Sequence, residues 1–134
     1  MSPAAERGFL LDTHCFVWLA ARAELVPEPV RERLAVADVP LWLSVASVWE
    51  MAIKRSLGKL ETDLPLGQLL EEQCEAMRLQ VLEISRDHAL AVENLPWYHR
   101  DPFDRLLVAQ ALEEDLGLVS ADAALDEYGV TRVW

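Results

Sequence analysis

Short apolar runs alternate with longer segments of helical periodicity along this chain, and the alternation limits the folds open to it. The first run, residues 9–12, is apolar and ends in an acid, which is typical of a strand buried on both faces of a parallel sheet. Further strands are predicted at residues 41–44, 79–84, 118–120 and 132–134. Helices are predicted at residues 14–22, 27–38, 45–57, 65–78, 85–95, 102–116 and 123–128.

The order of these elements predicts the fold class. Strands that alternate with helices, without a hairpin signal, indicate an α/β three-layer domain in which helices flank a central parallel sheet. The 134 residues match the length of one ordinary domain, and a hydrophobic fraction of 52% is enough for a packed core. We therefore expect a single domain over residues 1–134, with residues 1–7 as a loose N-terminal tail.

The formal net charge of −11 is unfavourable for a protein that meets phosphate backbones through clustered lysine and arginine. It favours a cationic partner, namely a divalent metal ion, an arginine-rich protein segment, or both. Cys15 and Cys74 lack the spacing of a zinc or redox motif, so we expect core residues in a reducing cytoplasm. No segment has the pattern of an export signal or a membrane span, which predicts a cytoplasmic location.

Four acidic residues lie where the chemistry of such a fold is expected. In open parallel sheets, ligands bind outside the carboxyl ends of the strands. Asp12 ends the first strand, Glu50 lies early in the helix after the second, Asp104 lies in the first turn of the long helix, and Asp122 follows the fourth strand. Each also has a structural interpretation. Asp12, Asp104 and Asp122 can cap helices, and Glu50 can pair with Lys54 one turn later.

Asp104 favours the functional interpretation, because Leu107, Val108 and Ala111 continue an apolar stripe from it. A carboxylate on an inward-facing stripe needs a cation or hydrogen-bond donors to compensate its burial. A pocket that holds all four carboxylates would repel itself without a bound divalent metal, and hard oxygen ligands select Mg²⁺ or Mn²⁺. A metal of this kind generates hydroxide from water for in-line attack on a phosphodiester.

Other chemistries have little support in the sequence. There is no Ser/His/Asp elbow, no glycine-rich phosphate loop and no His/Cys cluster for zinc. Six segments carry the recognisable pattern: residues 10–14 (LLDTH) with Trp18, residues 44–50 (SVASVWE) with Lys54, residues 58–60 (GKL), residues 99–105 (HRDPFDR), residues 120–122 (SAD) and residues 128–130 (YGV). In order and spacing, this combination resembles the PIN-domain toxins of the VapC type.

The resemblance implies a PIN-like parallel sheet flanked by helices and a Mg²⁺- or Mn²⁺-dependent endoribonuclease that hydrolyses RNA. It also implies which residues form the catalytic metal pocket, namely Asp12, Glu50, Asp104 and Asp122. Asp101 is assigned to capping, because it directly precedes Pro102.

Three further residues are expected on the substrate side of this pocket. Ser120 matches a hydroxyl position that can orient a water or ligand, and Lys54 is expected to face phosphate. Arg105 is expected either to touch phosphate or to pair with Asp101 one turn earlier. His14 matches the motif but is expected to be structural rather than a base.

The same resemblance implies a cognate VapB-like antitoxin that inserts a segment, often with an arginine, into the acidic groove, which agrees with the net charge. Homodimers are common in such toxins. Two alternatives stay open. One is a PIN-like binding or scaffold module without catalysis. The other is a phosphoacceptor receiver-like domain, which is disfavoured because Thr13 follows Asp12 where an acidic pair is needed, and Lys54 and Lys59 are the only lysines.

Overall fold

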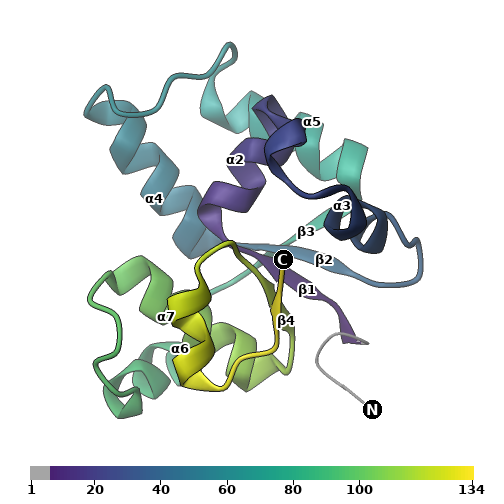
Figure 1. The fold of residues 1–134 in the computed structure, drawn as a ribbon. Helices are drawn as coiled ribbons and strands as arrows, with labels where there is room; N and C mark the ends of the chain where they lie inside the picture. The colour runs from purple at the N-terminus through teal and green to yellow at the C-terminus, as the bar shows by residue number, and fades with distance from the viewer. Residues whose placement is uncertain (1–6) are drawn as a thin grey trace.

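A computed structural model describes residues 7–134 and contains a five-stranded sheet in the order β3-β2-β1-β4-β5. All four strand pairs are parallel. Helices cover both faces, so the predicted α/β class is confirmed (Figure 1). The strands are β1 (Phe9–Leu11), β2 (Leu41–Ser44), β3 (Leu79–Leu82), β4 (Gly117–Val119) and β5 (Arg132–Val133).

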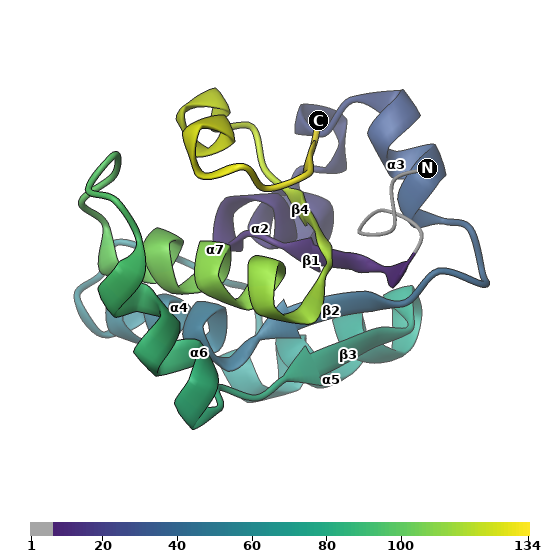
Figure 2. The ribbon, with the colours of Figure 1, turned by 90° about the horizontal axis from the view of Figure 1, so that it is seen from below.

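The helices follow the predicted order with shorter ends. They are α2 (Thr13–Ala21), α3 (Glu28–Leu34), α4 (Val45–Ser56), α5 (Leu66–Met77), α6 (Arg86–Ala91) and α7 (Pro102–Glu114), with 3₁₀ turns η1 (Ala23–Leu25), η2 (Val92–Asn94) and η3 (Ala123–Tyr128). Figures 1 and 2 show α2, α3 and α5 on one side of the sheet, and α6 and α7 side by side on the other. No helix within residues 7–134 is long and apolar enough to cross a membrane.

Three predicted helix ends were wrong. The helix expected over residues 27–38 ends at Leu34, because the chain must reach Pro40, whose carbonyl accepts a hydrogen bond from Phe9 N at 2.9 Å. The helix expected over 85–95 becomes α6 and then a 3₁₀ turn ahead of Pro96. The long helix α7 ends at Glu114 rather than at Leu116, because Asp115 takes the left-handed conformation (φ 55°).

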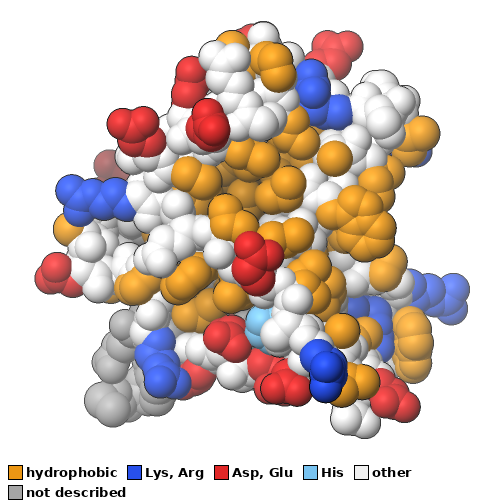
Figure 3. All heavy atoms as spheres, turned by 180° about the vertical axis from the view of Figure 1, so that it is seen from behind, with side chains coloured by type: hydrophobic (Ala, Val, Ile, Leu, Met, Phe, Trp, Pro, Cys, Tyr) orange, Lys and Arg blue, Asp and Glu red, His pale blue; other side chains and the backbone are white. Residues whose placement is uncertain are grey.

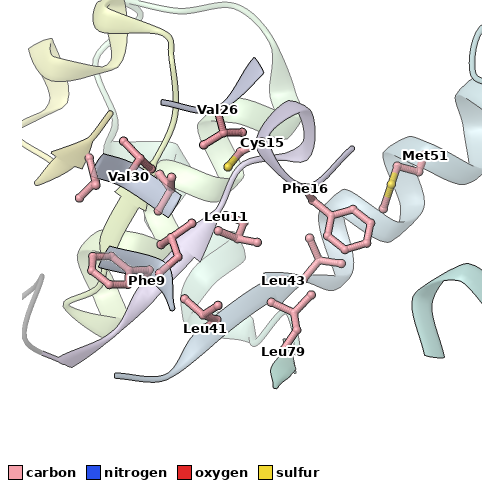
Figure 4. Packing of buried hydrophobic residues seen from close by; sticks show 13 residues of the cluster. Phe9, Leu11, Cys15, Phe16, Val26, Val30, Leu41, Leu43, Met51 and Leu79 are labelled. Atoms are coloured by element: carbon pink, nitrogen blue, oxygen red, sulfur yellow. The ribbon is translucent and has the colours of Figure 1, made fainter. Parts of the chain in front are cut away.

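Two apolar clusters fill the spaces between the layers, because neighbouring residues of a strand point to opposite faces. Leu11 packs with Phe16 and Leu43 on the α2, α3 and α5 side, whereas Leu10 packs with Leu107 on the α7 side. Figure 4 shows the Phe16 ring lying against Leu43. The central strand β1 is therefore buried on both faces, as its apolar sequence predicted.

The start of the described chain is held in place by close contacts with neighbouring elements. Gly8 has φ +140°, and a Cβ there would lie 2.8 Å from Pro40 O, so the close approach of β1 to β2 requires glycine. Arg7 pairs with Asp115 at 3.2 Å; the other residues of the predicted tail, 1–6, lie outside the described residues.

Seen from behind, hydrophobic side chains gather over the middle of the molecule, with acidic ones around them (Figure 3).

Candidate metal centre

The strand order reverses at β1, with β2 on one side and β4 on the other, and this is where ligands bind in open parallel sheets. Asp12 lies directly after β1 with only 8% of its surface exposed. Its Oδ1 accepts a hydrogen bond from Cys15 N at 2.7 Å, so the residue caps α2. Burial raises the pKa of Asp12, and the hydrogen bond from Ser120 opposes that rise.

Ser120 connects two of the expected acids. It follows β4, is fully buried, and its Oγ accepts a hydrogen bond from Asp122 N at 3.1 Å. Because the same hydroxyl donates to Asp12, one serine ties the end of β1 to the start of η3. Asp122 in turn caps η3 through Ala124 N at 3.0 Å. Capping and membership of the acidic pocket are therefore compatible for Asp12 and Asp122.

Glu50 reaches the same pocket from α4 and is 6% exposed. Its Oε1 lies 2.7 Å from the Thr13 hydroxyl, which also lies 2.9 Å from Ser47 Oγ. Its Oε2 lies 3.0 Å from Lys54 Nζ, so the expected pair one helical turn apart is present. The carboxylate is thus held from α2 by a hydroxyl and from its own helix by an ammonium group.

Asp104 comes from the first turn of α7 and is the most perturbed acid of the cluster. Its pKa is raised to about 6, first by burial and then by the like charge of Asp101, with smaller contributions from Glu50 and Asp12; His99 acts in the opposite direction. The mutual influence of Asp12, Glu50 and Asp104 places all three in one electrostatic environment.

His99 belongs to this cluster and was missed by sequence reasoning. Its Nε2 lies 3.1 Å from Asp122 Oδ2 and 3.4 Å from Asp104 Oδ2, and ligand atoms of the three residues lie within 4.8 Å of one another. Its Nδ1 accepts a hydrogen bond from Asp101 N at 3.2 Å, so Nε2 carries the hydrogen and donates to the carboxylates. Its sequence signal was its place at the start of the HRDPFDR segment, two residues before Asp101.

The donor set fits a hard divalent cation. Ligand atoms of His99, Asp104 and Asp122 lie within 4.8 Å of one another. Asp12 and Glu50 are not part of that group, but they lie near enough to raise the pKa of Asp104. Among residues 7–134, Lys54 is the one lysine or arginine that forms an ion pair with any of these acids. Burial raises the pKa values of Asp12 and Asp104, so these two carboxyl groups are short of positive charge. Oxygen ligands of this kind suit Mg²⁺ or Mn²⁺.

Arg105 lies elsewhere than expected. It is 2% exposed, and its guanidinium donates to the backbone carbonyls of Val92, Leu95 and Pro96, at 3.2, 3.2 and 2.8 Å, while the Trp97 ring covers it at 3.8 Å. The structure therefore corrects the expectation of a phosphate contact, because the arginine is fully engaged in holding the loop before α7. The alternative pairing with Asp101 is also not formed within the described residues.

The remaining predicted residues have plain structural places. Asp101 Oδ1 accepts from Phe103 N and Asp104 N, at 2.8 and 3.2 Å, which agrees with its assignment to capping. His14 is exposed at the start of α2 and lies 6.0 Å from the Trp18 ring.

A cavity of about 720 Å³ lies at the opposite ends of the strands, lined by Leu41, Met77 and neighbouring residues, and is separate from the carboxylates.

Fold and site together define an α/β domain with an acidic pocket at the switch point of a parallel sheet. The family model for the PIN domain matches residues 9–130. The chain therefore belongs to the PIN domain family. No curated protein sequence matches it.

Several solved structures share the fold across nearly the whole chain. VapBC2 from Rickettsia felis, bound to a DNA fragment from its promoter, gives a TM-score of 0.72 at 15% identity and covers 93% of this chain and 96% of that one. DNA-bound VapBC from Salmonella typhimurium gives 0.68 at 18%, covering 94% and 96%. VapBC-1 from nontypeable Haemophilus influenzae gives 0.67 at 17%, covering 93% and 96%. At these identities the likeness concerns the fold.

Proposed function

We propose that this protein is a Mg²⁺- or Mn²⁺-dependent endoribonuclease and the toxin of a VapBC-type toxin–antitoxin pair. The observation that carries the proposal is the group formed by Asp104, Asp122 and His99, whose ligand atoms lie within 4.8 Å of one another. Burial and the nearby charges of Asp101, Glu50 and Asp12 raise the pKa of Asp104 to about 6. Membership of the PIN family and the fold shared with VapBC structures support it.

Asp12, Glu50, Asp104 and Asp122 would hold the metal. Once bound, a divalent metal supplies a water of lowered pKa and neutralises charge on the phosphodiester. The chain's own residues prepare that site: Thr13 fixes one oxygen of Glu50, and Ser120 donates to Asp12. Because Ser120 is fully buried, we assign it to orienting Asp12 rather than to direct contact with RNA.

Two other groups have a role in proton and phosphate handling. Lys54 is partly exposed beside Glu50, and we propose that its ammonium group also faces a substrate phosphate. The Nε2–H of His99 points at Asp104 and Asp122, where it satisfies their oxygens in the absence of a cation. With a metal held by these carboxylates, the His99 N–H would be available to substrate or water.

We also propose a protein partner of the VapB kind. The net charge of −11 suits an antitoxin segment that brings arginine to the acidic pocket. The free thiols of Cys15 and Cys74 agree with a reducing cytoplasm. Homodimerisation stays a prediction that light scattering on the purified chain tests.

Asp12→Asn tests the proposed chemistry most directly. The full chain is incubated with unstructured and structured RNA, with Mg²⁺, Mn²⁺ or EDTA. We expect cleavage only with metal, and a loss of at least about 100-fold in the variant, since even outer-shell partners of metal ligands commonly contribute 10- to 100-fold. Asp38→Asn is the matched control, because Asp38 is exposed in the loop before β2.

Two outcomes would contradict the proposal. Cleavage that persists in EDTA, or an Asp12→Asn protein as active as the wild type, would exclude metal catalysis at this pocket. A correctly folded wild type that binds Mn²⁺ but cleaves no RNA would instead favour the alternative of a PIN domain that serves only in binding.

A further inference from the structure

The 3₁₀ turn η3 contacts His99 at both of its ends. Asp122, which caps the start of the turn, has its Oδ2 atom 3.1 Å from the imidazole Nε2. Tyr128, the last residue of the turn, accepts a hydrogen bond on its hydroxyl from the backbone N–H of His99 at 2.9 Å. One short segment therefore touches both the ring and the main chain of the histidine that faces Asp104 and Asp122.

The buried guanidinium of Arg105 supports the same arrangement. Its Nη1 donates to the Tyr128 hydroxyl at 3.2 Å and to the carbonyl of His99 at 3.4 Å. Both backbone polar groups of His99 are therefore engaged, its N–H by Tyr128 and its carbonyl by Arg105. The Nδ1 atom of the ring also accepts from Asp101 N at 3.2 Å, which leaves the hydrogen on Nε2, the atom that faces the carboxylates.

The Tyr128 hydroxyl is itself held in place by the packing of its ring. Tyr128 is half-buried and packs against the apolar cluster on the α7 side of the sheet. Its ring also contacts the ring of Tyr98, with centroids 5.2 Å apart and an interplanar angle of 60°. Because these contacts do not involve the hydroxyl, Tyr128→Phe removes a hydrogen-bonding group and keeps the packing.

We propose that Tyr128 is a positioning residue of the metal pocket, whose hydroxyl holds the His99 backbone and thereby keeps the Nε2–H beside Asp104 and Asp122. The inference rests on the proposed nuclease function and adds to its site a residue outside the carboxylates. Ligand atoms of Asp104 and Asp122 lie within 4.8 Å of each other, so the two charges repel when no cation is bound. A fixed donor beside both oxygens reduces this repulsion, and less reorganisation is then needed when a divalent metal binds.

Binding of Mn²⁺ to the full chain tests the proposal without depending on RNA. Calorimetric titrations are run on the wild type, Tyr128→Phe, His99→Ala and the double variant. Tyr98→Phe is the matched control, because Tyr98 is 53% exposed, contacts the same ring and also loses one hydroxyl. Cleavage of RNA at saturating Mn²⁺ gives kcat and KM. Nuclear magnetic resonance of the imidazole nitrogens in the metal-free protein reports the orientation of the His99 ring.

We expect Tyr128→Phe to weaken Mn²⁺ binding about 10- to 100-fold, the usual effect of a group that supports a metal ligand. The number of sites should stay at the wild-type value, whereas a purely structural defect would lower the fraction of protein that binds and leave the affinity unchanged. KM for RNA at saturating Mn²⁺ should not change. Tyr98→Phe should bind Mn²⁺ as the wild type does.

Two further results should show that the hydroxyl acts through the histidine. Tyr128→Phe should add nothing to the loss of Mn²⁺ affinity in the His99→Ala protein, because both changes delete the same support. In the metal-free wild type, the His99 signals should be sharp, with the hydrogen on Nε2. In Tyr128→Phe they should broaden, because the ring exchanges between orientations.

The outcomes separate this inference from the proposed function. A Tyr128→Phe protein that binds Mn²⁺ as tightly as the wild type, or more tightly, would overturn the positioning role. A further loss of affinity in the His99→Ala background would also overturn it, since the hydroxyl would then act by another route. A wild type that binds Mn²⁺ yet cleaves no RNA would overturn the nuclease function alone, while the affinities of the variants would still decide the role of Tyr128. A wild type that binds no Mn²⁺ would overturn both.

Discussion

Replacement of Asp104 by asparagine is expected to stabilise the metal-free protein at neutral pH. The folded state raises the pKa of this carboxyl from 3.8 to about 6, mainly through burial and the like charge of Asp101. A group with a raised folded pKa contributes stability below its unfolded pKa, and that stability is lost as the pH rises through about 6. At pH 7.5 the ionised Asp104 therefore lowers the free energy of unfolding of the metal-free protein.

The size of the effect follows from the shift. The increase of the Asp104 pKa from 3.8 to about 6 corresponds to about 3 kcal/mol of free energy that ionisation costs the folded state. Asp104 is mostly shielded from solvent, so the effect is not strongly screened. Asparagine also loses the favourable interaction of a negative charge with the first turn of α7, which is worth about 0.3–1 kcal/mol. We therefore expect Asp104→Asn to raise the free energy of unfolding by about 2 kcal/mol at pH 7.5 in EDTA.

Urea unfolding followed by tryptophan fluorescence measures this difference. The gain should shrink toward pH 4.5, where the wild-type carboxyl is protonated. Mg²⁺ should raise the stability of the wild type and leave the variant unchanged, since a ligand stabilises only the state that binds it. Asp38→Asn, at an exposed position, serves as the control. An Asp104→Asn protein less stable than the wild type at pH 7.5 in EDTA would refute the electrostatic reasoning.

Two further substitutions test the surroundings of the pocket. Thr13→Val removes the hydroxyl 2.7 Å from Glu50 Oε1, so metal-dependent cleavage should fall about 10- to 100-fold. Thr13→Ser keeps a hydroxyl and should retain most of the activity. Equal activity of the wild type and both variants would exclude a positioning role for Thr13. Arg105→Lys cannot reproduce the planar contacts to the loop carbonyls and to Trp97, so it should lower the free energy of unfolding by about 2–4 kcal/mol in thermal or urea unfolding. A variant of unchanged stability that binds RNA poorly would restore the phosphate role of Arg105.

The elements of the sheet could be predicted because their signals are local. An apolar run such as Phe9–Leu11 has few ways to bury itself other than as a central strand, and Asp12 at its end is then fixed at the carboxyl edge. Helix ends were less predictable. The shortening of α3 depends on where Pro40 must lie beside Phe9, a contact between residues far apart in the chain.

The candidate site was likewise predictable from the sequence only in part. The strand-end rule predicts that Asp12, Glu50, Asp104 and Asp122 lie at one edge of the sheet, from sequence position alone. The rule said nothing of His99, whose place in the cluster depends on how the loop before α7 folds over Tyr128. The backbone N–H of His99 donates a hydrogen bond to the Tyr128 hydroxyl at 2.9 Å.

The amino-acid sequence by itself thus determined the parallel α/β layers and the edge of the sheet at which acids gather, because periodicity and strand polarity act over a few residues. Only the tertiary structure decided that Arg105 is buried rather than free, that His99 faces two carboxylates, and that Trp49 meets Phe103. Those outcomes depend on how α4, α7 and the loop before it pack against one another, and side-chain direction across such contacts is set by the fold as a whole.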